Sequence, residues 1–198
     1  MDPFRATFIV LFIATAALRS YYRIKARGGT QEVVREKWAM LVRIVFGFPY
    51  ILGVALYIFD PQALKWSSLP IGTAWRWAGA VIFAFSLALL TWVHVTLGEN
   101  FSSELRIRSQ HELVTSGPYR YVRHPMYSAF LLLMIGMGLL SANWLIGAWG
   151  LAVAVLIVSL RTHMEEEMMT TAFGERYRQY AAGTGRFLPR LSRPSAQV

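Results

Sequence analysis

Residues 117–130, GPYRYVRHPMYSAF, place two Arg, three Tyr and a His-Pro pair directly before a long apolar run. Proline disfavours the helical region for the residue before it and suits the first position of a helix, so a helix is predicted to begin at Pro125 with His124 as its cap. The N–H groups of a first helical turn favour an anion or a carboxylate. This segment therefore predicts a binding site for a charged group, although an ordinary helix start and interfacial aromatic anchors account for the same residue types.

A second polar group follows the last apolar run and consists of Arg161 and the three consecutive carboxylates Glu165, Glu166 and Glu167. Arg161 and Glu165 are four residues apart and share one face of a helix. Adjacent carboxylates point in different directions round a helix, so at least one is expected to face inward. An inward Glu beside Arg161 offers one site for a cation and one for a carboxylate. A solvated ion pair is the alternative, and the sequence does not choose which Glu faces the pocket.

Metal chemistry is not expected. The four His residues show no spacing typical of metal ligands, and the chain has no Cys. Arg43 and His94 fall inside apolar runs, where ionisable side chains suggest function, whereas His163 is more typical of a surface residue. No role is assigned to Arg43, His94, His163 or Glu112.

The elements that carry these residues are predicted to span a membrane. Hydrophobic residues make up 55% of the 198 residues and charged residues only 16%, whereas soluble domains carry about 25% charged residues. The last apolar run, Met126 to Leu160, is too long for one span and is expected to fold back at Ser141-Ala142-Asn143. Five spans are predicted, at about 4–22, 39–59, 74–97, 126–141 and 143–160.

The predicted fold class is therefore an all-α polytopic membrane protein with a C-terminal helical hairpin. We interpret residues 1–198 as a single domain, because single helices in lipid gain little alone and associate by packing. The tail is predicted to continue the fifth span as a helix up to Gly174. Segments 98–127 and 161–190 leave the membrane on the same side and are expected to form the site.

The distribution of charge predicts the orientation. Three segments, 19–37, 98–125 and the tail from 161, hold 16 of the 20 basic residues, and such residues accumulate on the cytoplasmic side. With five spans, the N-terminus is then outside and the C-terminus cytoplasmic. Anionic membrane lipids are the expected counter-surface. Nucleic-acid binding is disfavoured, because the basic residues are dispersed and no recognition module is visible.

The motif HELVTSGPYRYVRHPMY, followed after a helical hairpin by R-x-x-x-EEE and FGERYRQY…GRFLP, resembles the isoprenylcysteine carboxyl methyltransferase family of integral membrane methyltransferases. The resemblance covers about residues 97–190, half of the chain. Related phospholipid methyltransferases share the Arg-His-Pro-x-Tyr and Glu-Glu elements. The C-terminal parts of membrane sterol reductases share a weaker form of the pattern but use NADPH. Such a reductase and a non-enzymatic membrane scaffold are the alternative functions.

What the resemblance implies is an S-adenosylmethionine pocket on the cytoplasmic side and a lipophilic methyl acceptor, such as an isoprenylcysteine-like carboxylate. The ammonium of the cofactor would suit Glu165, aromatic faces would stabilise its sulfonium, and methyl transfer chiefly needs alignment of the reactants. Arg161 would face the acceptor. Carried over by motif, the cofactor contacts are His111, Leu113, Val114, Tyr119, His124, Pro125, Tyr127 and Glu165. The sequence does not choose among carboxylate, amine and thiol acceptors.

Overall fold

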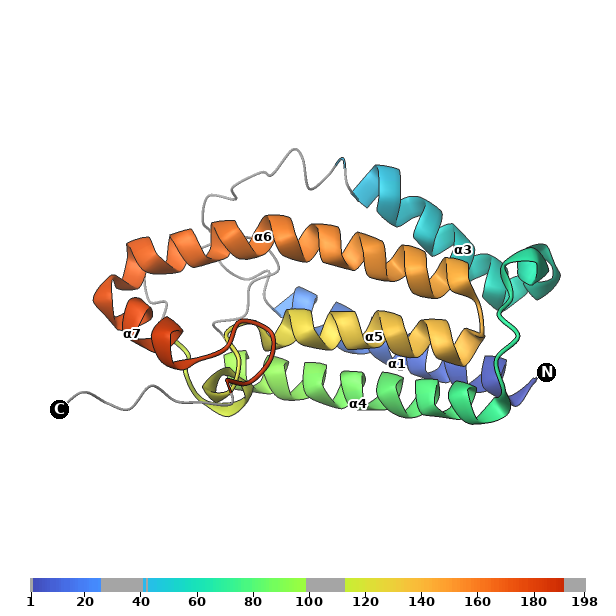
Figure 1. The fold of residues 1–198 in the computed structure, drawn as a ribbon, viewed down its shortest axis with the longest axis horizontal. Helices are drawn as coiled ribbons and strands as arrows, with labels where there is room; N and C mark the ends of the chain where they lie inside the picture. The colour runs from blue at the N-terminus through green and yellow to red at the C-terminus, as the bar shows by residue number, and fades with distance from the viewer. Residues whose placement is uncertain (1, 26–40, 42, 99–112, 191–198) are drawn as a thin grey trace.

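The computed structural model describes residues 2–25, 41, 43–98 and 113–190, and within these ranges its regular structure is helical apart from two isolated β-bridges. Four long helices lie side by side (Figure 1). They are α1 Pro3–Lys25, α4 Thr73–Leu97, α5 Pro125–Ser141 and α6 Gly150–Phe173. The shorter elements are η2 Arg43–Gly47, α3 Phe48–Phe59, η3 Pro61–Ser67, η5 Gly117–Arg120, η6 Leu145–Trp149 and α7 Glu175–Gly183. The predicted all-α fold is confirmed.

Both ends of α5 follow from local sequence as predicted. Pro125 occupies its first turn, and His124 is its N-cap residue with φ −124° and ψ 59°. At the other end Ala142 takes the left-handed conformation with φ 50°. Asn143 then donates a hydrogen bond to the Ser67 hydroxyl at 2.8 Å, and its Oδ1 accepts one from the Ile146 N–H at 3.2 Å. The predicted fold-back at residues 141–143 is thus confirmed.

Glycine allows α4 and α5 to pack closely. A Cβ added to Gly79 would lie 2.5 Å from the backbone nitrogen of Leu140, and one on Gly136 would lie 2.7 Å from the backbone nitrogen of Phe83. Small residues at such crossings are typical of helices packed in membranes, where close backbone approach replaces the hydrophobic effect as the driving force. This contact holds the end of α5 in a defined position against the first half of α4.

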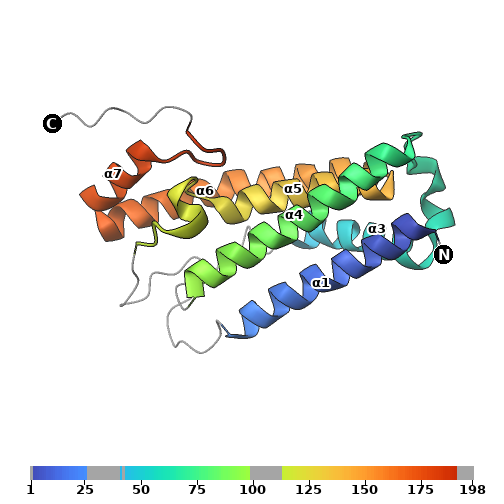
Figure 2. The same cartoon turned by 90° about the horizontal axis from the view of Figure 1, so that it is seen from below.

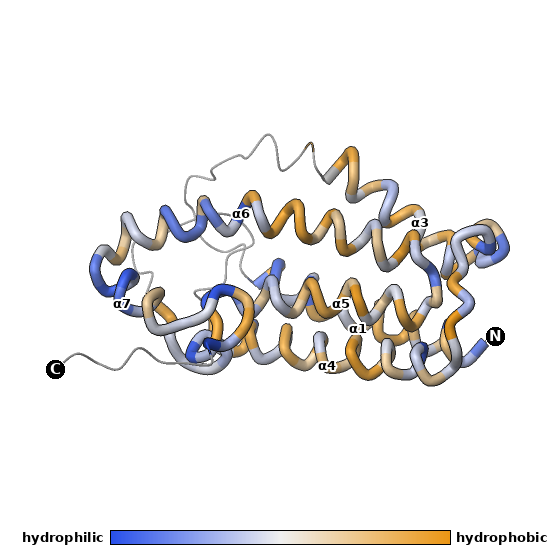
Figure 3. Tube along the Cα trace, viewed as in Figure 1, coloured by the Kyte–Doolittle hydropathy of each residue, from blue (hydrophilic) through white to orange (hydrophobic). Residues whose placement is uncertain are grey.

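Apolar side chains fill the interior and also cover much of the outside. Phe8, Phe83, Leu90 and Leu140 are fully buried and join α1, α4 and α5. Figure 3 shows apolar residues along most of the helical bundle and polar residues gathered at the end that carries α7. Many large apolar side chains are exposed, among them Val10, Ile13, Phe48, Phe59, Val81 and Phe85. An apolar exterior of this extent fits a multi-pass integral membrane protein.

The predicted spans coincide with helices where the structure describes them. Among the described residues, three helices are long and apolar enough to cross a membrane: Pro3–Lys25, Thr73–Leu97 and Leu145–Phe173. The bent pair Ile44–Phe59 and Pro61–Ser67 makes a fourth if it is one span. Helix α5 is apolar but has only 17 residues. The number of five spans therefore stays a prediction.

The tail returns to the bundle after α6. Helix α6 ends at Phe173, because Gly174 takes a positive φ of 55°. This end agrees with the predicted helix up to Gly174. Helix α7 follows, and the chain after it turns back toward the start of α5, at the end where α1 and α4 also finish (Figures 1 and 2). The polar segments around 117–124 and 161–188 therefore meet at one end of the bundle.

Candidate active site

Residues 184–188, here called the strap, fold the C-terminal segment back onto the start of α5. The N–H of Arg123 donates to the carbonyl of Gly185 at 2.8 Å, and the N–H of His124 donates to the carbonyl of Arg186 at 3.0 Å. These bonds satisfy backbone groups that precede the helix. The strap thereby fixes the loop before α5 to the tail beyond α7.

Glu165 on α6 is the carboxylate that reaches across to α5. Its Oε1 accepts a hydrogen bond from the Tyr127 hydroxyl and lies 3.5 Å from Nη2 of Arg161. Its Oε2 lies 3.6 Å from Nδ1 of His124. The side chain is 26% exposed, so a ligand can still reach it. The structure thus brings together four predicted site residues, and Arg161 and Glu165 share one face of α6 as predicted.

Glu166 faces inward as well, but it is surrounded by cationic and imidazole groups of the chain. Its Oε1 accepts hydrogen bonds from Nε of Arg123 at 3.2 Å and from Nε of Arg186 at 3.1 Å. Nε2 of His124 lies 3.1 Å from the same oxygen. Charge-assisted bonds of this kind are the stronger ones in proteins. Glu166 therefore links α6, the start of α5 and the strap.

Glu167 points away from these contacts. It is 67% exposed and pairs with His163 at 3.1 Å, one turn earlier on the same helix. His163 is itself 76% exposed, which confirms its interpretation as a surface residue. The expectation that at least one of the three carboxylates faces inward is confirmed, since two of them do.

The two inward carboxylates act on the protonation of His124. Burial by itself lowers the pKa of its imidazole. The hydrogen bonds and charges of Glu165 and Glu166 raise that pKa, and together they outweigh the effect of burial. The pKa of His124 therefore lies above its usual range, because both ring nitrogens face carboxylate oxygens. In its protonated form His124 joins the two carboxylates to the first turn of α5.

The other predicted cofactor contacts lie on the chain that leads to α5. Tyr119 is half-buried in η5, and its carbonyl accepts a hydrogen bond from the Tyr180 hydroxyl on α7 at 2.6 Å. Burial raises the pKa of the Tyr119 phenol above its usual range. Leu113 and Val114 are half-buried just before η5, and Pro125 is buried. His111 and Glu112 lie outside the described residues.

The first turn of α5 uses more of its own N–H groups than the sequence suggests. The N–H groups of Tyr127 and Ser128 both donate to the carbonyl of His124 at 3.1 Å. This tight turn leaves fewer donors for an anion than an open helix start would. An anionic group of a ligand would therefore depend more on nearby guanidinium groups.

Sequence reasoning assigned no role to several residues that shape this end of the bundle. Arg186 and Tyr180 lie within the quoted motif FGERYRQY…GRFLP, which was the available signal. His94 is fully buried, and its ring stacks on that of Tyr22 with centroids 4.4 Å apart. Arg19 on α1 reaches α5. The sequence feature that could have indicated a role for Arg19 is its position in the last two turns of an apolar helix.

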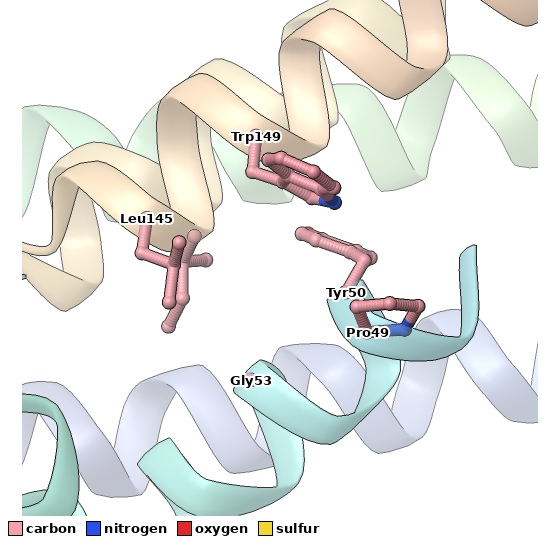
Figure 4. Close-up of a pocket in the computed structure, with 6 residues that line it drawn as sticks. Pro49, Tyr50, Gly53, Leu145 and Trp149 are labelled. Carbon is pink, nitrogen blue, oxygen red and sulfur yellow. The ribbon is translucent and has the colours of Figure 1, made fainter. Parts of the chain in front are cut away.

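An apolar pocket lies apart from this cluster. Figure 4 shows it between α3 and the start of the last long helix, lined by Pro49, Tyr50, Gly53, Leu145, Ile146 and Trp149. Its volume is about 160 Å³. The sequence distance from this lining to Glu165 corresponds to several turns of α6, so the pocket does not belong to the polar site.

Taken together, the geometry provides a partly exposed carboxylate, a buried Tyr hydroxyl, a guanidinium and an imidazole at a junction of apolar helices. Glu165 suits the ammonium of a ligand and Arg161 suits a carboxylate. Tyr rings nearby suit a sulfonium. Among the described residues no group of His, Asp or Glu side chains has an arrangement that could hold a metal ion.

Comparison with known proteins identifies relatives of this chain. A family model described as the isoprenylcysteine carboxyl methyltransferase family matches residues 78–171, which include α5 and most of α4 and α6. The chain is 32% identical over 144 residues to a probable protein-S-isoprenylcysteine O-methyltransferase of Oryza sativa subsp. indica, covering 71% of this chain and 75% of that protein. It is 36% identical over 80 residues to methanethiol S-methyltransferase of Pseudomonas deceptionensis, covering 40% of this chain and 29% of that protein.

The fold is also similar to a solved structure. The structure of the eukaryotic intramembrane Ras methyltransferase, an isoprenylcysteine carboxyl methyltransferase, aligns with a TM-score of 0.55 at 22% sequence identity. The alignment covers 79% of this chain and 54% of that chain. This chain therefore shares its membrane fold over about half the length of the larger protein.

Proposed function

Because the chain belongs to the isoprenylcysteine carboxyl methyltransferase family and is a membrane methyltransferase, we propose that it transfers a methyl group from S-adenosylmethionine to the carboxylate of an isoprenylcysteine-like acceptor. The observation that carries this proposal is the contact of Tyr127, Arg161 and Glu165, which joins α5 to α6 where the apolar bundle meets polar residues. Such a place is accessible to a water-soluble donor from one side and to a lipophilic acceptor from the other.

The residues present fit the donor. When bound, S-adenosylmethionine supplies a methyl group on a positively charged sulfur, which passes to a lone pair of the acceptor without proton transfer if that acceptor is a carboxylate. Glu165 binds the ammonium of the donor, since its carboxylate is partly exposed and already oriented by Tyr127. Tyr119 and Tyr127 supply aromatic groups near the sulfonium, while the segment with His111, Leu113, Val114, His124 and Pro125 forms the rest of the donor site.

Arg161 is the residue that orients the acceptor. It lies on α6 one turn before Glu165, toward the apolar part of that helix. A planar guanidinium holds a carboxylate through two parallel bonds. Alignment of the reactants, not covalent catalysis by the protein, accounts for most of the rate in this reaction.

We place the site on the cytoplasmic side, with the N-terminus outside. The support is the distribution of basic residues together with the helices, since α1 begins at the end opposite to α7 (Figure 1). The positively charged segments then face anionic lipid headgroups.

A thiol acceptor is the second candidate, and the similarity to methanethiol S-methyltransferase favours it. Family membership favours either of these reactions over an NADPH-dependent reductase. The experiment is a titration of purified protein with S-adenosylmethionine, its demethylated product and NADPH, followed by assays with farnesylated N-acetylcysteine and with a lipophilic thiol. We expect binding of the first two compounds and methyl ester formation. Binding of NADPH alone would refute the proposal.

A further inference from the structure

Arg19 contributes a cationic side chain from α1 to the face of α5 next to the site. Its guanidinium lies over the Phe130 ring, 4.8 Å from the ring centroid, and its Nη1 lies 3.7 Å from Sδ of Met126. Met126 and Phe130 are four residues apart on α5 and flank Tyr127, whose hydroxyl bonds Glu165. Arg19 therefore approaches the same helical turn that carries the site.

The partners of Arg19 are unusual for a half-buried guanidinium. Within the described ranges, its side chain contacts a thioether and an aromatic face. No ion pair joins Arg19 to a carboxylate among these residues. A charged side chain inside an apolar helix is costly and suggests a functional partner. Met126 precedes Tyr127 in the chain, and the Tyr127 hydroxyl donates to the Glu165 carboxylate that pairs with Arg161. Arg19 and Arg161 therefore approach the first turns of α5 from α1 and from α6.

Snorkelling to the membrane surface does not explain this placement. A snorkelling Arg extends its charged end along the helix toward water, as Arg23 does one turn later, where its side chain is exposed. Arg19 is only partly exposed and turns onto α5 instead. Among the described residues Glu165 pairs with Arg161, but no carboxylate pairs with Arg19, so an anion between the two guanidinium groups would reduce their repulsion.

We propose that Arg19 is a second acceptor-binding residue, whose guanidinium binds the carboxylate of a lipophilic acceptor together with Arg161. This inference rests on the proposed function and extends it, because it assigns the membrane-facing side of the acceptor site to α1. The carboxylate approaches from the apolar face formed by α1 and α5, and Arg161 meets it from α6.

This arrangement also distinguishes substrate from product. In the reaction a carboxylate oxygen forms a bond to the methyl carbon while the bond from that carbon to sulfur breaks, and the electron pair of the broken bond stays on sulfur. The acceptor loses its negative charge when it becomes an ester. Two guanidinium groups therefore bind the substrate more tightly than the product, and the product leaves the site.

The test compares Arg19→Gln and Arg19→Lys with the matched control Arg23→Gln, which removes one charge from the exposed face of the same helix. For each protein, turnover is measured with farnesylated N-acetylcysteine, binding of its methyl ester is measured in parallel, and affinity for S-adenosylmethionine is measured by calorimetry. We expect Arg19→Gln to raise KM for the carboxylate by about tenfold or more, with cofactor affinity unchanged, and to lose the preference for acid over ester. Arg19→Lys should show a smaller rise in KM.

The outcomes separate this inference from the proposed function. If wild-type protein methylates the carboxylate and Arg19→Gln behaves like Arg23→Gln, the inference is wrong and the proposed function stands. If wild-type protein methylates only thiols, both are wrong. If Arg19→Gln unfolds in detergent, the comparison of Arg19→Lys with Arg23→Gln decides, and an unchanged KM in Arg19→Lys overturns the inference.

Discussion

Tyr127 and Glu165 join the two helices of the C-terminal hairpin at its open end, where the phenol hydroxyl of α5 donates to the carboxylate of α6. The residues are 38 positions apart in the chain. Their contact orients a carboxylate that remains partly exposed. An oriented and accessible carboxylate is what a cationic ligand requires, since little conformational entropy remains to be lost on binding.

Glu165→Gln should weaken binding of S-adenosylmethionine while the fold is retained. A hydrogen bond to a charged group contributes about 1.5–3 kcal/mol, so the dissociation constant should rise roughly 10- to 100-fold. Calorimetry measures the affinity, and circular dichroism checks the fold. Glu167→Gln is the control, because this substitution makes the same change of charge on an exposed face of the helix. A loss of affinity in Glu166→Gln in place of Glu165→Gln would show that the wrong carboxylate is assigned.

Glu166→Gln should act mainly on stability. Three side chains, Arg123, His124 and Arg186, lose their shared carboxylate in this variant. We expect a loss of about 1–3 kcal/mol in the free energy of unfolding, as for other hydrogen-bonded charges that lose a partner. Thermal unfolding in detergent measures the loss, and hydrogen exchange at the strap should increase. Unchanged exchange there would mean that Glu166 does not hold the strap.

Arg161→Lys should reduce turnover more than affinity for the cofactor. The substitution keeps the positive charge but removes the planar group that holds a carboxylate through two bonds. Turnover with farnesylated N-acetylcysteine and cofactor affinity by calorimetry are compared in the same preparation. Equal losses of both would assign Arg161 to Glu165 as a structural partner and remove it from the acceptor site.

His124 should make stability fall as the pH rises. Its pKa in the folded protein is raised by Glu165 and Glu166, so its contribution is complete below the usual pKa of about 6.5 and disappears as the pH rises through the folded-state value. Unfolding temperatures measured between about pH 6 and pH 9 should fall in wild type and in the control His163→Gln. The fall should be smaller in His124→Gln, and an equal fall in all three proteins would contradict the assignment.

Gly136→Ala should destabilise the crossing of α4 and α5. The added Cβ would lie 2.7 Å from the backbone nitrogen of Phe83, and overpacking of this kind costs about 1–3 kcal/mol. Gly53→Ala on α3 is the control, since its nearest neighbour would be a Leu145 side-chain atom at 3.9 Å. Thermal unfolding compares the two variants. Equal stability would mean that the helices can separate without cost.

The start of α5 and the end of α6 could be predicted from the sequence because each depends on local backbone chemistry. Proline determines where α5 begins, and a glycine with positive φ determines where α6 ends. The pairing of Arg161 with Glu165 also follows from helical spacing alone. The resemblance of the motifs to a methyltransferase family likewise lies in the sequence.

Which carboxylate does what was decided only by the tertiary structure. Neighbouring Glu residues have equivalent local sequence signals, and the rotation of α6 against α5 turns Glu165 to Tyr127 and Glu166 to Arg123 and His124. The approach of Arg19 to α5 has the same origin, since helical periodicity does not specify which face of α1 packs against which neighbour. Local sequence therefore determined the helices and their ends, while close packing between helices far apart in the chain determined which charged groups meet.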